Sequence, residues 1–82
     1  MYEDINEPIE TAVHFQSGKA NPLAFRWHKN VFKIKGVHLC HKFRKGSDVI
    51  YAYSVSTEND DTFKISFNPN SLTWTLDQIC NA

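Results

Sequence analysis

The side chains with the greatest chemical capacity in this chain stand together in the segment His38-x-Cys40-His41. Zinc takes four tetrahedral ligands, which proteins usually supply as two ligand pairs. A strand would place His38 and Cys40 on one side and His41 on the other, and the only other thiol in the sequence is Cys80. Because a second pair is missing, we expect no metal site. We interpret the segment as surface histidines beside a half-buried thiol.

Cys40, with its histidine neighbours, is also a candidate nucleophile. An activated cysteine needs a base within hydrogen-bond reach and a site that stabilises an oxyanion. A helix N-terminus or a glycine-rich loop would supply that site, and the sequence predicts neither. The acidic segment 58–61 lacks the glycine and the distal glutamate of an EF-hand, so it indicates a polar hairpin loop. We therefore expect no enzyme activity and no cofactor.

Charge is distributed very unevenly along the chain. Residues 1–18 hold four acids and no Lys or Arg, residues 19–45 hold eight Lys and Arg and no acid, and residues 46–82 hold five acids and one lysine. Phosphate contacts dominate nucleic-acid affinity, so nucleic acid or another polyanion is a candidate partner. The alternative is that the acidic flanks fold back and neutralise the basic third. The candidate polyanion-binding residues are Arg26, Lys29, Lys33, Lys35, Lys42, Arg44 and Lys45.

The length of 82 residues allows one domain with a thin core, because so short a chain buries only about 60% of its unfolded surface. The acidic start lacks the apolar run of a secretory signal, and no segment approaches the length of a membrane span. Two cysteines suit a reduced cytoplasmic protein, with a single Cys40–Cys80 disulfide as the alternative. We expect residues 1–7 to be an acidic tail that need not be ordered, and residues 8–80 to be one β domain.

Apolar residues alternate with polar ones over most of the chain, which is typical of half-buried strands. Turn residues separate six such runs at intervals of roughly 8–12 residues. This pattern predicts an all-β fold, a small six-stranded antiparallel barrel or a strongly bent sheet. The expected core is Val13, Phe15, Phe25, Trp27, Phe32, Ile34, Val37, Tyr53, Val55, Phe63, Ile65, Phe67, Trp74 and Leu76.

The second and third runs define a basic β-hairpin. A tight turn at 29–30, or a longer loop over 28–31, would place Trp27 opposite Phe32 and Phe25 opposite Ile34. The same register places Arg26 opposite Lys33 on the outer surface. Gly36 predicts a bulge, since the apolar parity changes there from even to odd, with Val37, Leu39 and Phe43 on one face after it.

Several short motifs resemble a bacterial family of small all-β domains of unknown function. They cover roughly residues 7–80 and are Glu7-Pro8-Ile9, Val13-x-Phe15-x-x-Gly18, Pro22-x-x-Phe25-x-Trp27, Phe32-x-Ile34-x-x-Val37 and Trp74-Thr75-Leu76. Some relatives in that family are appended to Y-family DNA polymerase-like proteins. The sequence departs from the pattern at Lys29-Asn30, where a glycine turn is usual, and at Phe43, near the position of a usual tryptophan. The resemblance implies no catalytic residues.

Two functions are compatible with these patterns. The first is a non-enzymatic binding module that contacts nucleic acid or another polyanion through the basic hairpin. The second is a protein-interaction module, either self-associating or docking a partner through a strand edge. Salt dependence separates them, because each neutralised phosphate releases counterions.

Overall fold

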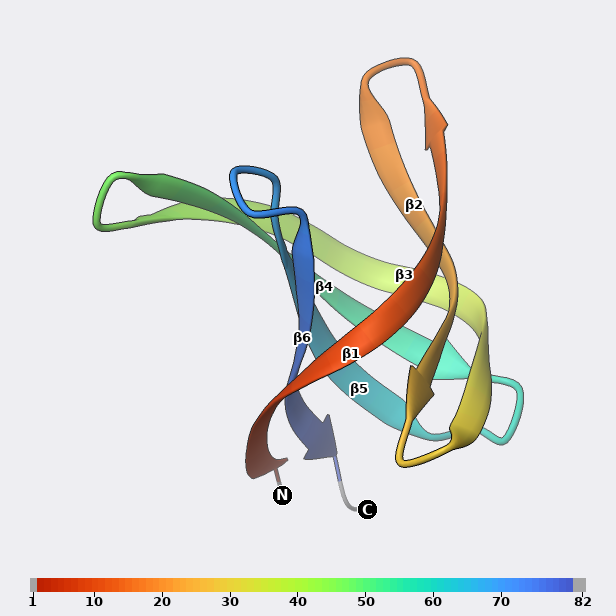
Figure 1. The fold of residues 1–82 in the computed structure, drawn as a ribbon. Helices are drawn as coiled ribbons and strands as arrows, with labels where there is room; N and C mark the ends of the chain where they lie inside the picture. The colour runs from red at the N-terminus through yellow and green to blue at the C-terminus, as the bar shows by residue number, and fades with distance from the viewer. Residues whose placement is uncertain (1, 81–82) are drawn as a thin grey trace.

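The structure, a computed structural model, describes residues 2–80 and is all-β. Six antiparallel strands follow one another around a closed barrel in chain order (Figure 1). This confirms the fold class that the alternation predicts. The strands are β1 (Tyr2–Gln16), β2 (Lys19–Trp27), β3 (Asn30–Lys45), β4 (Asp48–Thr57), β5 (Thr62–Asn68) and β6 (Thr73–Cys80).

The long first strand closes the barrel. Its first half pairs with β6, from Tyr2 opposite Cys80 to Ile9 opposite Trp74, and its second half pairs with β2. Residues 2–7, which we expected as a tail, therefore lie within the sheet. The physical reason is that β6 would otherwise present a row of unpaired backbone groups at the edge of the sheet. Tyr2 and Cys80, the first and last of the described residues, lie opposite each other in this pair.

The core lies inside the barrel and consists mostly of the predicted residues. The most deeply buried side chains include Phe25, Val55, Ile65 and Leu76, each at most 1% exposed. Two predicted core residues are wrong: Phe15 is 65% exposed and Val37 is 44% exposed. Phe15 lies where β1 extends past the barrel, and Val37 lies beyond the point where β3 stops pairing with β2, so no opposite wall covers either side chain.

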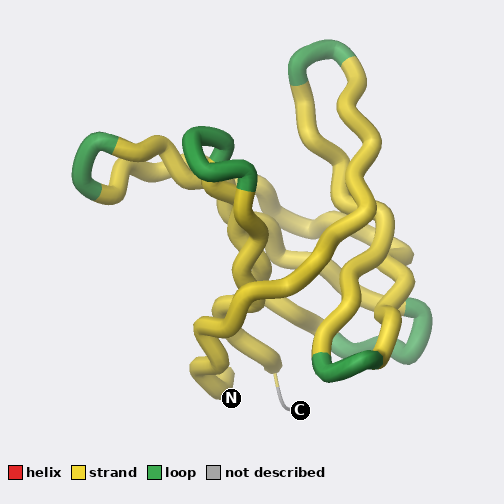
Figure 2. Tube along the Cα trace, in the orientation of Figure 1, coloured by secondary structure: helices red, strands yellow, loops and turns green. Residues whose placement is uncertain are grey.

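Two hairpins project from the barrel. The β1–β2 arm comprises residues 13–22, and the β3–β4 arm comprises residues 39–50. Both arms end in short loops, and none of the described residues is helical (Figure 2). The arms diverge, so the face between them is open on one side.

Two bulges bend β3 as it crosses from β2 to β4. The first lies between Ile34 and Gly36, which confirms the bulge predicted at the glycine. The second lies between Val37 and Leu39, and the sequence analysis missed it. Because each extra residue reverses the faces that follow, Leu39 and Phe43 do not share the face of Val37. The prediction that all three form one apolar face is wrong.

Candidate binding site

The predicted basic hairpin is present, but its turn and register differ from the prediction. His28 and Lys29 both have positive φ, 51° and 67°, as the two central residues of a primed hairpin turn do. The turn at 29–30 is therefore wrong by one residue, and the register is wrong by two. Arg26 lies opposite Val31, not Lys33. The strongly curved β2–β3 pair prefers the primed turn because its twist matches that of the strands.

The same shift corrects the two aromatic pairs. Phe25 lies opposite Phe32, with ring centroids 5.1 Å apart, and Trp27 lies opposite Asn30. A register slip of two leaves every side chain on its predicted face, since the strand period is two. Phe25 and Phe32 therefore still pack in and against the core, and the Arg26 side chain is still exposed on the outer surface.

Acidic partners neutralise part of the hairpin. Arg26 donates to Glu10 of β1 at 3.1 Å, and Lys35 forms an ion pair with Asp60 of the β4–β5 loop. The pairing with Lys35 holds the pKa of the Asp60 carboxyl below its usual value. Both acids come from the flanking segments, so the alternative of internal neutralisation applies to these two cations.

The other five candidate cations divide between two distant places. Lys29 and Lys33 lie on the β2–β3 hairpin, exposed and without an ion pair among residues 2–80. Lys42, Arg44 and Lys45 lie on the β3–β4 arm, and Lys45 stands opposite Asp48. The seven residues therefore do not form a single patch, because the long strand β3 carries basic residues at both of its ends.

The second bulge determines which side chains the β3–β4 arm presents. Cys40 lies opposite Tyr53 and Lys42 opposite Tyr51, so these side chains point to the inner side of the barrel wall. Arg44 follows on the same face. Leu39 and Phe43 lie on the outer face and are 56% and 44% exposed. The arm therefore has a cationic inner face and an apolar outer face.

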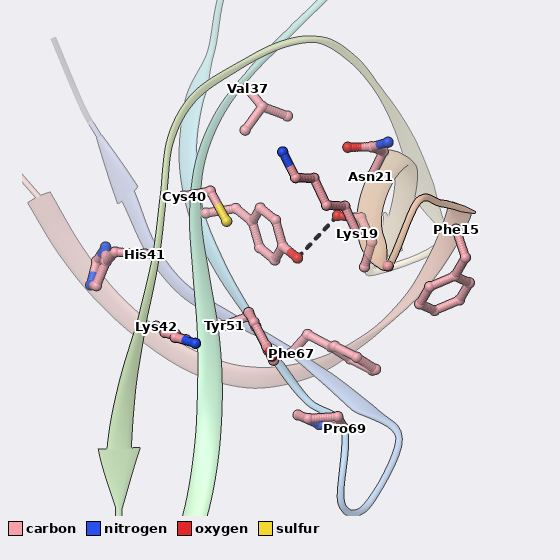
Figure 3. A pocket seen from close by; sticks show the side chains of 13 residues that line it. Phe15, Lys19, Asn21, Val37, Cys40, His41, Lys42, Tyr51, Phe67 and Pro69 are labelled. Atoms are coloured by element: carbon pink, nitrogen blue, oxygen red, sulfur yellow. Dashed lines mark hydrogen bonds between the residues drawn. The ribbon is translucent and has the colours of Figure 1, made fainter.

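A hollow of about 600 Å³ lies between the two arms. Figure 3 shows Lys19 and Asn21 on the β2 side, Val37 and Cys40 on the β3 side, and aromatic rings on the floor. Its lining residues are Phe15, Gly18, Lys19, Ala20, Asn21, Val37, Cys40, His41, Lys42, Tyr51, Tyr53, Phe67 and Pro69. Sequence reasoning missed Lys19 and the tyrosines here, because only the divergence of β2 from β3 brings them together.

The backbone edges that flank the hollow are unpaired. β2 and β3 pair only from Ala24 opposite Lys33 to Trp27 opposite Asn30. Beyond that point β3 pairs with β4 on its other side only. We call residues 37–45 of this strand the free β3 edge. On the β2 side, the Ala20 carbonyl accepts a hydrogen bond of 3.0 Å from the Tyr53 hydroxyl. Burial of that hydroxyl raises the pKa of Tyr53 to about 12.

The histidine and cysteine cluster is divided between the two faces of the sheet. His38 occupies the bulge and bonds the Ser56 Oγ at 2.9 Å, whereas Cys40 faces Tyr53. The prediction that His38 and Cys40 point to the same side is therefore wrong, because the bulge breaks the alternation. Both cysteines are free thiols, so the alternative of a Cys40–Cys80 disulfide does not hold in this structure. Among residues 2–80, no group of His, Cys, Asp and Glu has an arrangement suited to a metal ion.

Comparisons with known proteins leave the resemblance noted in the sequence untested. No family model, no curated protein and no solved structure matches the chain. The described residues include no helix that is long and apolar enough to cross a membrane.

Proposed function

We propose that this domain is a non-enzymatic binding module that receives an extended acidic segment of a partner protein along the free β3 edge. The observation that carries the proposal is the edge itself, where unpaired strand backbone coincides with unpaired cations. Strand addition to an exposed edge is a common mode of peptide recognition, in which backbone hydrogen bonds supply affinity. The cations Lys42 and Arg44 favour carboxylates on the added strand.

Exposed apolar side chains support a protein partner over nucleic acid. Leu39 and Phe43 lie on the outer face of the same edge, and Val37 lies at its start. Apolar side chains beside an open edge suit a second strand, which would cover them. The chain as a whole carries no net charge, so no general attraction to a polyanion adds to the local one.

The same edge disfavours a second copy of this chain. An antiparallel pair of two β3 edges would bring the basic residues of one copy close to those of the other, and like charges opposite each other destabilise a sheet. Lysines and bulges are devices by which edge strands resist self-pairing. The lysines do not oppose a partner strand that carries carboxylates, and the bulge precedes the regular stretch of the edge from Leu39 to Lys45.

Polyanion binding is the second candidate function. Lys19 and Lys42 flank the hollow, and the Phe15 and Tyr51 rings lie beside them (Figure 3). A cationic groove with rings is the arrangement that single-stranded nucleic acid uses, through phosphate contacts and stacking. Tyr53 and Phe67 do not contribute stacking surface, because they are only 5% and 6% exposed.

A binding titration of the whole chain distinguishes the two functions. The probes are a labelled peptide of about eight glutamate and valine residues, a length that matches the free edge, and a labelled oligothymidylate of similar length. We expect the peptide to bind at low salt and to shift the amide resonances of residues 37–45. The double variant Lys42→Glu, Arg44→Glu should weaken peptide binding by about tenfold or more. The matched control Lys29→Glu, Lys33→Glu, on the other hairpin, should leave it unchanged.

Each alternative result has a clear meaning. Oligothymidylate binding that falls steeply with salt, without peptide binding, would replace strand addition by the polyanion function. Binding of neither probe would reject both. Equal losses in the two double variants would show that overall charge, not the β3 edge, drives the association.

A further inference from the structure

The free β3 edge has two chemically different faces, and a strand added there would have its own side chains on both. From Leu39 to Lys45, β3 pairs with β4 residue by residue, without another bulge. A partner strand would therefore meet a regular stretch. Cross-strand neighbours in such a stretch lie on the same face of the sheet. The inner and outer faces of the edge can thus be considered separately.

On the inner face, the added side chains would extend over the hollow. They would be next to Cys40, Lys42 and Arg44, with Lys19 of β2 on the far side of the same hollow (Figure 3). None of these three cations forms an ion pair within residues 2–80. A carboxylate at this position would have cations on both of its sides.

On the outer face, the added side chains would be next to Leu39 and Phe43. These side chains are about half exposed, and the ring of His41 lies between them, 6.0 Å from that of Phe43. An apolar side chain from the partner would remove this surface from water. An acidic side chain there would meet no Lys or Arg among the described residues of the arm's outer face except Lys45 at its end, which lies opposite Asp48.

Resting on the proposed function, we infer that the partner segment is an extended strand of about seven residues in which acidic and apolar side chains alternate. The acidic set would lie over the hollow and the apolar set would lie over Leu39 and Phe43. The length follows from the regular stretch of the edge, and the alternation follows from the two-residue period of a strand.

Two peptides of identical composition test the pattern. One alternates glutamate and valine, and the other places all glutamates before all valines. We expect the alternating peptide to bind the whole chain at least about tenfold more tightly, because only this peptide matches both faces. Binding of both with equal affinity would overturn the inferred pattern but leave the proposed function standing. Binding of neither would reject the proposed function itself.

Variants of the two faces provide independent readouts. Phe43→Ser should weaken binding of the alternating peptide. Leu72→Ser, which removes another exposed apolar side chain in the β5–β6 turn, should leave that binding unchanged. The variant Lys42→Glu, Arg44→Glu should no longer bind the alternating glutamate–valine peptide. It should instead bind a peptide in which lysine and valine alternate. Failure of this exchange, in a variant whose amide spectrum shows the intact fold, would exclude the inner face as the site of the charged side chains.

Discussion

Tyr53 links the barrel wall to the β1–β2 arm. Its ring packs in the core, and its hydroxyl donates to the Ala20 carbonyl across the floor of the hollow. This contact satisfies one backbone acceptor that strand pairing leaves free. Burial and the nearby Cys40 raise its pKa because the phenolate would lose water and gain no cation.

The raised pKa of Tyr53 predicts that the free energy of unfolding decreases at alkaline pH. The unfolded chain loses the Tyr53 proton near pH 10, whereas the folded chain holds it until about pH 12. The stability that this group contributes is therefore fully present below pH 10 and is lost as the pH rises to 12. Tyr53→Phe should cost about 1 kcal/mol at neutral pH through the lost hydrogen bond. That deficit should vanish between pH 10 and pH 12 when the free energy of unfolding is measured against pH.

Tyr51→Phe is the matched control for this prediction. Its hydroxyl makes no hydrogen bond within the described part of the chain, so removing that hydroxyl should change stability little at neutral pH. An equal deficit in both variants, or a Tyr53→Phe deficit that is constant across the alkaline range, would contradict the role given to Tyr53.

The hairpin turns that join the strands differ in backbone conformation. The β2–β3 turn is unusual because two non-glycine residues, His28 and Lys29, adopt left-handed backbone conformations. That conformation costs an ordinary residue roughly 1 kcal/mol, and glycine adopts it freely. Local contacts offset part of this cost, since Glu7 accepts hydrogen bonds from Trp27 Nε1 at 3.0 Å and contacts His28 Nε2 at 3.1 Å.

Replacing Lys29 by glycine should therefore stabilise the domain. Lys29→Gly relieves the positive φ of 67° without removing a hydrogen bond or ion pair, and we expect a gain of about 0.5–1 kcal/mol. Denaturant unfolding measures the change. Lys33→Gly is the control, because glycine within a strand weakens it, so this variant should lose stability. A loss in both variants would show that the turn does not have the primed geometry.

The β3 strand shows how far local sequence determines an element. Gly36 marks the first bulge, and the parity change around it was readable in the sequence. His38, at the second bulge, is an ordinary strand residue, and no turn residue accompanies it. The position of this bulge depends on how β4 meets β3, so the faces of the β3–β4 arm could not be predicted.

Closure of the barrel is the dominant feature of the whole molecule. β1 pairs with both β6 and β2. Its N-terminal half pairs with β6, so that β6 has no free edge. Ile9, on this half, is 9% exposed and packs in the core cluster. An acidic sequence is compatible with this role because residues 2–4 and 6–8 are all exposed, and only Ile5 and Ile9 of this half are covered.

Removing residues 1–8 should open the barrel. The truncated chain loses the ladder from Tyr2 to Pro8, and we expect a loss of cooperative unfolding or association through the exposed β6 edge. Denaturant unfolding together with light scattering measures both. Glu10→Gln, which removes a charge and an ion pair from the same strand, should change stability by less than about 1 kcal/mol. A truncated chain as stable as the full one would show that residues 2–8 do not contribute to the barrel.

The sequence by itself determined the strands, most turns and most core residues. Phe63, Ile65 and Phe67 illustrate this, because the alternation of apolar and polar residues along one strand is a local property. The same face of the strand is buried whichever element packs against it. The hairpin turns around residues 58–61 and 68–71 were likewise set by their own polar residues.

Only the tertiary structure decided the binding surface. Lys19 and Lys42 line one hollow because β2 and β3 diverge. Arg26 and Lys35 form ion pairs with acids that are distant in sequence, so they are not free to bind a partner. Which side chains lie close together depends on the register, the bulges and the closure of the barrel. These features are determined by contacts between many pairs of strands. A single run of residues does not contain that information, so a block of eight basic residues in sequence became several separate groups in space.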